Sequence, residues 1–115
     1  MSAQLGRERR LVEALATLRP HYDLILIDTA PSMSIVSVNA FTASDGILIP
    51  VQTENLALEG VALLMGTIQE VRRLLNNSLG VDAVIMTMHS PTLLNTQVAG
   101  HLRETFGDLV LNPPI

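Results

Sequence analysis

The stretch Leu24 to Ser32 reads LILIDTAPS, four aliphatic residues followed by an acid and a turn. An apolar run that is continuous rather than alternating is typical of a strand buried on both faces of a parallel sheet. A carboxylate at the end of such a strand stands in a wet turn, where it can hold a hydrated Mg²⁺. Asp28 is therefore a candidate magnesium residue. Capping of the turn or of the next helix is the alternative, and spacing does not separate the two.

Outward from this stretch, the chain alternates between helical and strand periodicity. Leu11, Leu15 and Leu18 recur at helical spacing before Pro20. We expect helices over 11–18, 35–43, 58–75 and 94–106 and strands over 24–27, 46–51, 81–89 and 109–112. The strand over 46–51 also reads as buried on both faces. Helix-length connections between strands predict an α/β fold with a parallel sheet, flanking helices and right-handed crossovers.

Composition limits the classes of protein. The chain has 115 residues, 48% of them hydrophobic, which predicts a single domain over 1–115 with a packed core. It has no signal-peptide pattern and no apolar run of roughly 20 residues, so we expect a cytoplasmic protein without a membrane span. The formal charge of −4 argues against a strong electrostatic hold on nucleic acid.

Polar loops follow every expected strand. In an open parallel sheet the ligand crevice lies beyond the carboxyl ends of the strands, so we expect these loops to converge on one rim. Besides Asp28 they supply Thr29, Ser32, Ser34, Gln52, Thr53, Glu54, Asn55, His89, Ser90, Thr92, Asn95 and Asn112. A serine nucleophile at Ser32 is not favoured, because no G-x-S-x-G elbow surrounds it. We interpret Met86 and Met88 as packing residues.

Two segments resemble the middle and later parts of the ParA-type partition ATPases, the deviant-Walker family that includes MinD. They are YDLILIDTAPSMSIVSVNAFTASDGILIPVQTENLALEG and VIMTMHSPTLLNTQVAGHLRETFGD, and the resemblance covers about residues 22–107. The motifs ILIDTAPS and IPVQTENLALEG carry it. The resemblance implies a fold like that of the P-loop NTPases and, in the intact family, ATP and Mg²⁺ as ligands.

The resemblance also implies roles for particular residues. Asp28 would hold the magnesium through water, and the turn from Thr29 to Ser34 would sense the γ-phosphate. Pro31 would stiffen that turn through its fixed φ. The implied cofactor-binding set is Asp28, Thr29, Pro31, Ser32, Asn112 and Pro113. The implied dimer-face set is Gln52, Glu54, Leu58 and Glu59.

The family role implied is ATP-dependent segregation of chromosomes or plasmids. We therefore expect a homo-oligomer or a full-length ParA-like partner, with a ParB-like protein as a further candidate. The family's loop after the TM(Y/H) strand often carries an arginine, which HSPTLLN lacks, so DNA binding is not expected. Arg72, Arg73 and Arg103 are the candidates if it occurs.

The chain departs from the family in what it lacks. All seven basic residues are arginine, so there is no Walker A lysine, and the seven glycines never cluster into a phosphate-binding loop. We expect no ATP hydrolysis by this chain alone. In the family's sheet the P-loop strand lies between the strands ending at Asp28 and at Val51. Without it the chain has open strand edges, and we expect self-association.

Three classes of function stay open. The first is a truncated ParA-like ATPase domain with the Walker B and switch region. The second is a non-enzymatic interaction module that docks on itself or on a full-length ParA-like partner. A distant third is a relative of the nitrogenase iron protein or of the cobyrinate synthetase-like branch. The absence of cysteine argues against a cluster-bearing iron protein.

Overall fold

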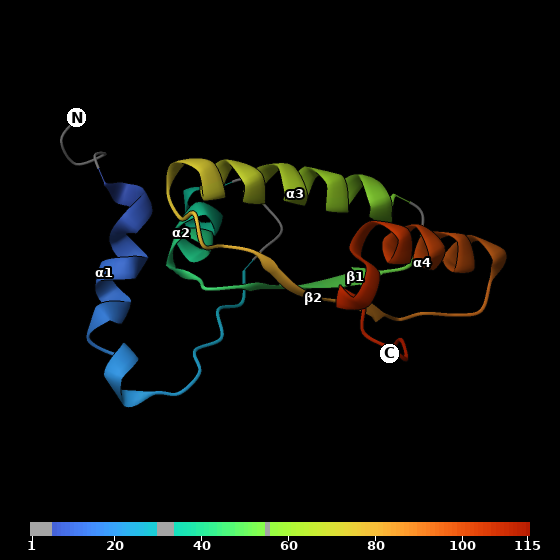
Figure 1. Ribbon diagram of the computed structural model, residues 1–115, viewed down its shortest axis with the longest axis horizontal. Coiled ribbons are helices and arrows are strands. Elements are labelled where there is room, and N and C mark those ends of the chain that lie inside the picture. Colours follow the sequence, from blue (N-terminus) through green and yellow to red (C-terminus); the bar gives the residue numbers. More distant parts are fainter. Residues whose placement is uncertain (1–5, 30–33, 55) are drawn as a thin grey trace. The chain divides into compact units, whose positions relative to one another are not determined.

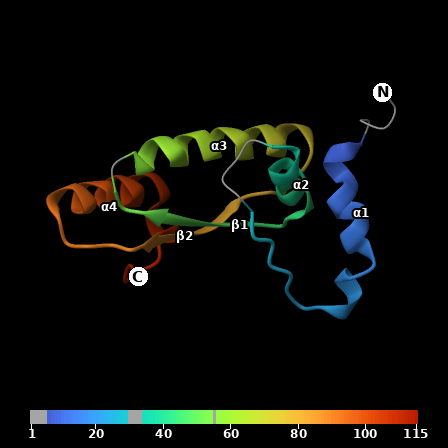
Figure 2. The ribbon, with the colours of Figure 1, turned by 180° about the vertical axis from the view of Figure 1, so that it is seen from behind.

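The computed structural model describes residues 6–29, 34–54 and 56–115. The chain divides into two compact units. Unit 1 comprises Met1–Asp45 and Thr67–Leu79, and unit 2 comprises Gly46–Gly66 and Gly80–Ile115. Figures 1 and 2 show the ribbon from two opposite sides. In the part of the chain described, no helix is long and apolar enough to cross a membrane.

Unit 1 is helical, and its first two α-helices are held together by one asparagine. The Asn39 carboxamide accepts a hydrogen bond from the Leu11 N–H at 3.1 Å and donates one to the Arg7 carbonyl at 2.8 Å. This side chain therefore joins α2 to the start of α1. The elements are η2 (Arg7–Arg9), α1 (Arg10–Ala16), η3 (Arg19–His21), α2 (Ile35–Ala43) and the second part of α3 (Ala57–Leu74).

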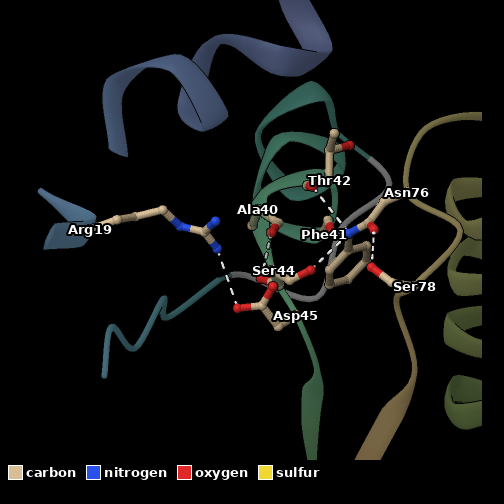
Figure 3. Close-up of polar contacts among 8 residues, drawn as sticks. All are labelled: Arg19, Ala40, Phe41, Thr42, Ser44, Asp45, Asn76 and Ser78. Atoms are coloured by element: carbon tan, nitrogen blue, oxygen red, sulfur yellow. Dashed lines mark hydrogen bonds and ion pairs between the residues drawn. The ribbon is translucent and has the colours of Figure 1, made fainter. Parts of the chain in front are cut away.

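Both ends of α2 are capped by side chains. At its start the Ser34 hydroxyl accepts a hydrogen bond from the Ser37 N–H at 3.4 Å, as expected of an N-cap serine. At its end the Asn76 amide nitrogen lies 3.1 Å from the carbonyls of Phe41 and Thr42 and 2.7 Å from that of Ser44 (Figure 3). Carbonyls at a helix C-terminus have no partner within the helix, so Asn76 satisfies groups that would otherwise need water.

Unit 2 is built on two parallel strands, β1 (Ile47–Gln52) and β2 (Val81–Thr87). Their register runs from Ile47 opposite Val81 to Gln52 opposite Thr87. The unit also contains the first part of α3, the helix α4 (Leu93–Phe106) and η4 (Gly107–Leu109). Gly107 ends α4 with a φ of 58°, a conformation that glycine adopts readily. The α/β class, the parallel pairing and the last two long helices are therefore confirmed.

The expectation that β1 is buried on both faces is wrong. Ile49 and Val51 are buried, whereas Leu48 is 53% exposed and Pro50 is exposed. The first part of α3 and α4 lie on the same side of the strands in both views (Figures 1 and 2). In the described part of unit 2 the helices thus cover one face of the sheet, and alternate side chains of β1 point to the uncovered one.

The expectation that residues 24–27 form a buried strand is also wrong. These residues have no regular structure (Figure 1). Leu24 and Leu26 are 75% and 76% exposed. A strand needs a neighbour for its backbone N–H and carbonyl groups. No described residue pairs with this stretch, and the neighbour implied by the family resemblance, the P-loop strand, has no counterpart in this sequence.

The expected strand over 109–112 is reduced to a short contact with β2. Val110 forms an isolated parallel bridge with Val84, and the N–H groups of Leu111 and Ile115 donate to the Val84 and Met86 carbonyls at 2.9 and 2.8 Å. A full strand does not form because η4 takes up the first residues, and Pro113 and Pro114 have no N–H to donate. Residues 110–115 nonetheless occupy the edge of β2 that faces away from β1.

Candidate functional site

Asp28 lies at the end of the aliphatic run with an exposed side chain. Among the described residues, none forms a hydrogen bond or an ion pair with its carboxylate. Thr29 is half-buried, and Ser34 is occupied as the N-cap of α2. Pro31 and Ser32, the other switch residues predicted, lie outside the described residues. The chain therefore presents the Asp28 carboxylate to solvent directly before the turn.

The donor chemistry of Asp28 fits magnesium bound together with phosphate. Mg²⁺ keeps several of its waters and is bound by one or two carboxylates plus the oxygens of a substrate phosphate. An exposed carboxylate can accept hydrogen bonds from such waters. Within residues 6–29, 34–54 and 56–115, no group of three or more histidine, aspartate or glutamate side chains could hold a metal. Asp28 could therefore supply one carboxylate to a magnesium site whose other ligands are waters and phosphate oxygens.

The loops after β1 and β2 meet in unit 2. Thr53 follows β1, and its hydroxyl lies 2.8 Å from Nδ1 of His89, which follows β2. The Thr53 side chain is 1% exposed, so this contact satisfies a buried hydroxyl. The His89 N–H also donates to the Ile115 carbonyl at 3.1 Å. Part of the expected rim therefore exists as a connected polar cluster at the carboxyl ends of two neighbouring strands.

Sequence reasoning placed Thr53 in a rim loop and His89 at the end of the expected strand over 81–89, but it missed their pairing. The observed strand β2 ends two residues earlier, at Thr87. A usable signal was present, because each residue comes directly or almost directly after a strand, and the two strands were expected to be parallel. The register between the strands, which sets residues 52 and 87 opposite one another, could not be read from the sequence.

Met88 is not a packing residue as expected. Its φ is 51°, in the left-handed region that residues with a Cβ rarely adopt, and its side chain is 75% exposed. The Gln52 amide donates a hydrogen bond to its sulfur at 3.0 Å. Met86, two residues earlier, is completely buried as predicted. The left-handed residue breaks the alternation of the strand and directs Met88 outward.

The predicted dimer-face residues run from Gln52, the last residue of β1, through the following loop into the start of α3. Gln52, Glu54, Leu58 and Glu59 are all exposed in unit 2. The loop is fixed by its backbone, since the Glu54 N–H donates to the Gln52 carbonyl at 2.8 Å. Leu56 has a φ of 70° and is 65% exposed. The role of these residues at an interface stays a prediction.

Asn112 and Pro113 are joined by a cis peptide bond near the end of unit 2. The Asn112 carboxamide oxygen accepts a hydrogen bond from the Arg103 guanidinium at 2.9 Å. Arg73 separately forms an ion pair with Glu70 at 2.8 Å. Of the three arginines named as candidates for DNA contacts, Arg73 and Arg103 therefore have partners within the chain.

The predicted site residues divide between the two units. Asp28 and Thr29 belong to unit 1, whereas Asn112, Pro113 and the dimer-face set belong to unit 2. Unit 1 also contains a cavity of about 160 Å³, which none of the predicted site residues lines. Its walls are Val12, Leu15, Arg19, Thr42, Ala43, Ser44, Asp45 and Asn76.

Comparison with known proteins gives consistent matches. The family model described as an AAA domain matches residues 1–81. The sporulation initiation inhibitor protein Soj of Bacillus subtilis is 41% identical over 107 residues, which cover 92% of this chain and 42% of Soj. The chromosome partitioning protein ParA of Caulobacter vibrioides is 42% identical over 112 residues, 95% of this chain and 42% of that protein. The chain spans about two fifths of the length of these relatives.

A solved structure agrees with the sequence matches. The cobyrinic acid a,c-diamide synthase of Mycobacterium smegmatis, crystallised with ADP and magnesium, superposes with a TM-score of 0.84 at 32% identity. The match covers 97% of this chain and 46% of the synthase. It extends the likeness to the cobyrinate synthetase-like branch, and the fold is that of the ParA-like P-loop NTPases. The chain belongs to the AAA-domain family and, within it, to the ParA/MinD-type partition ATPases.

Proposed function

We propose that this chain carries the metal-facing switch region of a ParA-type nucleotide switch, whose family role is ATP-dependent segregation of chromosomes or plasmids. The observation that carries the proposal is the exposed Asp28 carboxylate, which no described residue engages, directly after an aliphatic run. The N-cap of α2 is Ser34, so Asp28 does not cap that helix.

In this proposal the residues of the turn divide the work. Asp28 accepts hydrogen bonds from the waters of a nucleotide-bound Mg²⁺, and Thr29, with Pro31 and Ser32, forms the segment that responds to the terminal phosphate. The Ser34 cap couples that segment to α2, because the helix begins one residue later. When bound, the magnesium neutralises charge on the phosphates.

The phosphate-gripping part of the switch is not supplied by these 115 residues, which contain no lysine and no cluster of glycines. Backbone N–H groups of a glycine-rich loop and a lysine provide most of the electrostatic stabilisation of a bound triphosphate. We therefore propose that ATP binds this chain weakly and that hydrolysis requires a second polypeptide segment.

Paramagnetic NMR tests the role of Asp28 even if binding is weak. With Mn²⁺ and ATP as the probe, we expect amide signals of residues 28 and 29 to broaden, and Asp28→Asn to abolish the broadening. The matched control is Asp23→Asn, an exposed acid on the other side of the aliphatic run. Equal broadening at both acids would refute a specific role for Asp28. Tight Mg²⁺-dependent ATP binding would refute the division of the switch.

A second candidate function is that of a non-enzymatic module that docks on another copy of itself or on a full-length ParA-like partner, in the cytoplasm. The observation that favours it is exposed apolar surface at several loops, including Leu56 and Met88. A pull-down with full-length Bacillus subtilis Soj, with and without ATP, tests the docking. Capture that is independent of nucleotide and of Asp28 would favour the module. In a separate pull-down with a ParB-like protein, capture would indicate that the chain takes part in a partition complex.

A further inference from the structure

One methionine of unit 2 is open to reagents in solution. Met88 directly follows β2 and is 75% exposed, whereas Met86, two residues earlier in the strand, is 0% exposed. Met65 on α3 is half-buried, and these three are the methionines within the described residues. Among them, Met88 is therefore the one that a dissolved oxidant reaches most readily.

The exposure of Met88 follows from its own backbone. Its φ of 51° interrupts the alternation that would otherwise place Met88 on the same face as Met86. The loop that contains Met88 has neighbours on both sides within unit 2. On one side the Thr53 hydroxyl contacts His89 at 2.8 Å, and on the other the Ile115 carbonyl accepts a hydrogen bond from the His89 N–H at 3.1 Å. The loop is thus held in place while the Met88 side chain points outward.

The sulfur of Met88 has a polar partner. Gln52, the last residue of β1, donates a hydrogen bond from its amide Nε2 to this sulfur at 3.0 Å. Thioether sulfur is a weak acceptor with two lone pairs, so one lone pair stays available for reaction. Because Gln52 ends one strand and Met88 follows the other, their contact joins the carboxyl ends of β1 and β2.

We propose that Met88 is a modification site, at which a peroxide oxidises the thioether to a sulfoxide in the folded chain and Gln52 then binds the new oxygen. A sulfur lone pair attacks one peroxide oxygen, and the S–O bond forms as the O–O bond breaks. With hydrogen peroxide, the departing hydroxide takes up the remaining proton and leaves as water, so sulfur is oxidised and the peroxide is reduced. Rotation of the unbranched side chain turns the new oxygen toward the Gln52 amide.

Oxidation at this position changes the surface and keeps the fold. A sulfoxide is polar, and its oxygen is a stronger acceptor than thioether sulfur, so the contact between Met88 and Gln52 becomes stronger. The same change at Met86 would place a polar group in the core. The modification therefore gives unit 2 a peroxide-responsive surface beside the predicted dimer-face residues. It depends neither on nucleotide nor on Asp28.

Limited treatment with hydrogen peroxide tests the selectivity. Tandem mass spectrometry of the digested protein assigns the added oxygen to Met86 or Met88. In the folded chain Met88 should oxidise at least about tenfold faster than Met86, because a buried sulfur reacts only when the structure opens. In concentrated urea the two rates should become equal, which makes Met86 an internal control. Equal rates in the folded chain would overturn the proposal.

Nuclear magnetic resonance tests the role of Gln52. In an isotope-labelled sample, the side-chain amide protons of Gln52 should shift downfield on oxidation, because oxygen replaces sulfur as their acceptor. The amide of Gln97, an exposed glutamine on α4 in the same unit, should not shift. A Gln52 signal that stays in place while mass spectrometry shows Met88 to be oxidised would refute the contact with the sulfoxide.

Met88→Leu provides the matched variant, since leucine is apolar, has a similar volume and does not react with peroxide. It should abolish the shift of the Gln52 amide. A shift that persists in Met88→Leu would show that peroxide acts elsewhere and would overturn the assignment to Met88. Both measurements on the wild-type chain stand even if this variant does not fold.

Discussion

Two aliphatic runs of similar composition meet different fates in this chain. Ile47–Gln52 forms a strand whose Ile49 and Val51 are buried, whereas residues 24–27 are irregular and exposed. Strand propensity does not distinguish LILI from ILIP, and the second even contains a proline. What differs is the neighbour, because β1 pairs with β2 along its whole length. A strand is thus a property of a pair of segments.

The sharpest way to break this comparison is to truncate one side chain in each run. Ile49→Ala should lower the free energy of unfolding by about 2–5 kcal/mol, since the side chain is 3% exposed and its removal leaves a cavity. Leu26→Ala should change it by less than about 0.5 kcal/mol at concentrations where the chain is monomeric. Urea denaturation followed by circular dichroism measures both. Equal losses would show that residues 24–27 are packed as a strand after all.

The C-terminus of α2, which precedes β1 in the chain, is held by the Asn76 side chain. Asn76→Ala removes the donor to three carbonyls and should cost about 1–3 kcal/mol, because those carbonyls are partly buried. Asn77→Ala is the matched control, an exposed asparagine in the same turn, and should be nearly neutral. Thermal denaturation of the two variants gives the difference. If both behave alike, the cap does not contribute to stability.

The helices could be predicted closely because their signals are local. The bounds expected for α2, 35–43, match the structure, and α3 and α4 differ from expectation by a residue or two. The apolar period and the glycine that ends α4, Gly107, are both read within a few residues of the helix they define. The strands were predicted less well, because residues 24–27 and 109–112 depend on neighbours far away in the sequence. A run of hydrophobic residues does not say whether such a neighbour exists.

The candidate site shows the same limit. Asp28 could be named from ILIDTAPS, and its role stays a prediction, since the structure shows only that its side chain is exposed. The contact between Thr53 and His89 depends on strand register. The left-handed backbone of Met88 could not be predicted from the sequence, because methionine rarely adopts that conformation. Asn76 reads in sequence only as part of a turn. Contacts between segments were therefore missed even where the segments themselves were right.

The first residue before β1 offers a finer test of how its register is held. A Cβ added to Gly46 would overlap the carboxylate of Asp82, most closely at Oδ2 and with Cγ at 2.5 Å. Gly46→Ala should therefore destabilise the protein by about 1 kcal/mol, an amount typical of overpacking that a side chain can partly relieve. In the background of Asp82→Ala the same substitution should be nearly neutral. A double-mutant cycle measured by urea denaturation gives the coupling, and additive effects would refute the overlap.

The smallest effect should come from the ion pair between Arg19, which precedes residues 24–27, and Asp45, which follows α2. Arg19 and Asp45 lie 3.3 Å apart with side chains 55% and 91% exposed, at the base of α2 in Figure 3. Solvent screens such a pair, so Arg19→Ala should lower stability by less than about 0.5 kcal/mol, and 0.5 M salt should remove most of that difference. A larger, salt-independent loss would mean that Arg19, one of the residues that line the cavity, acts through its aliphatic stem. Arg19→Met, which keeps a comparable apolar stem without the charge, separates the two, because it restores stability only if packing is the cause.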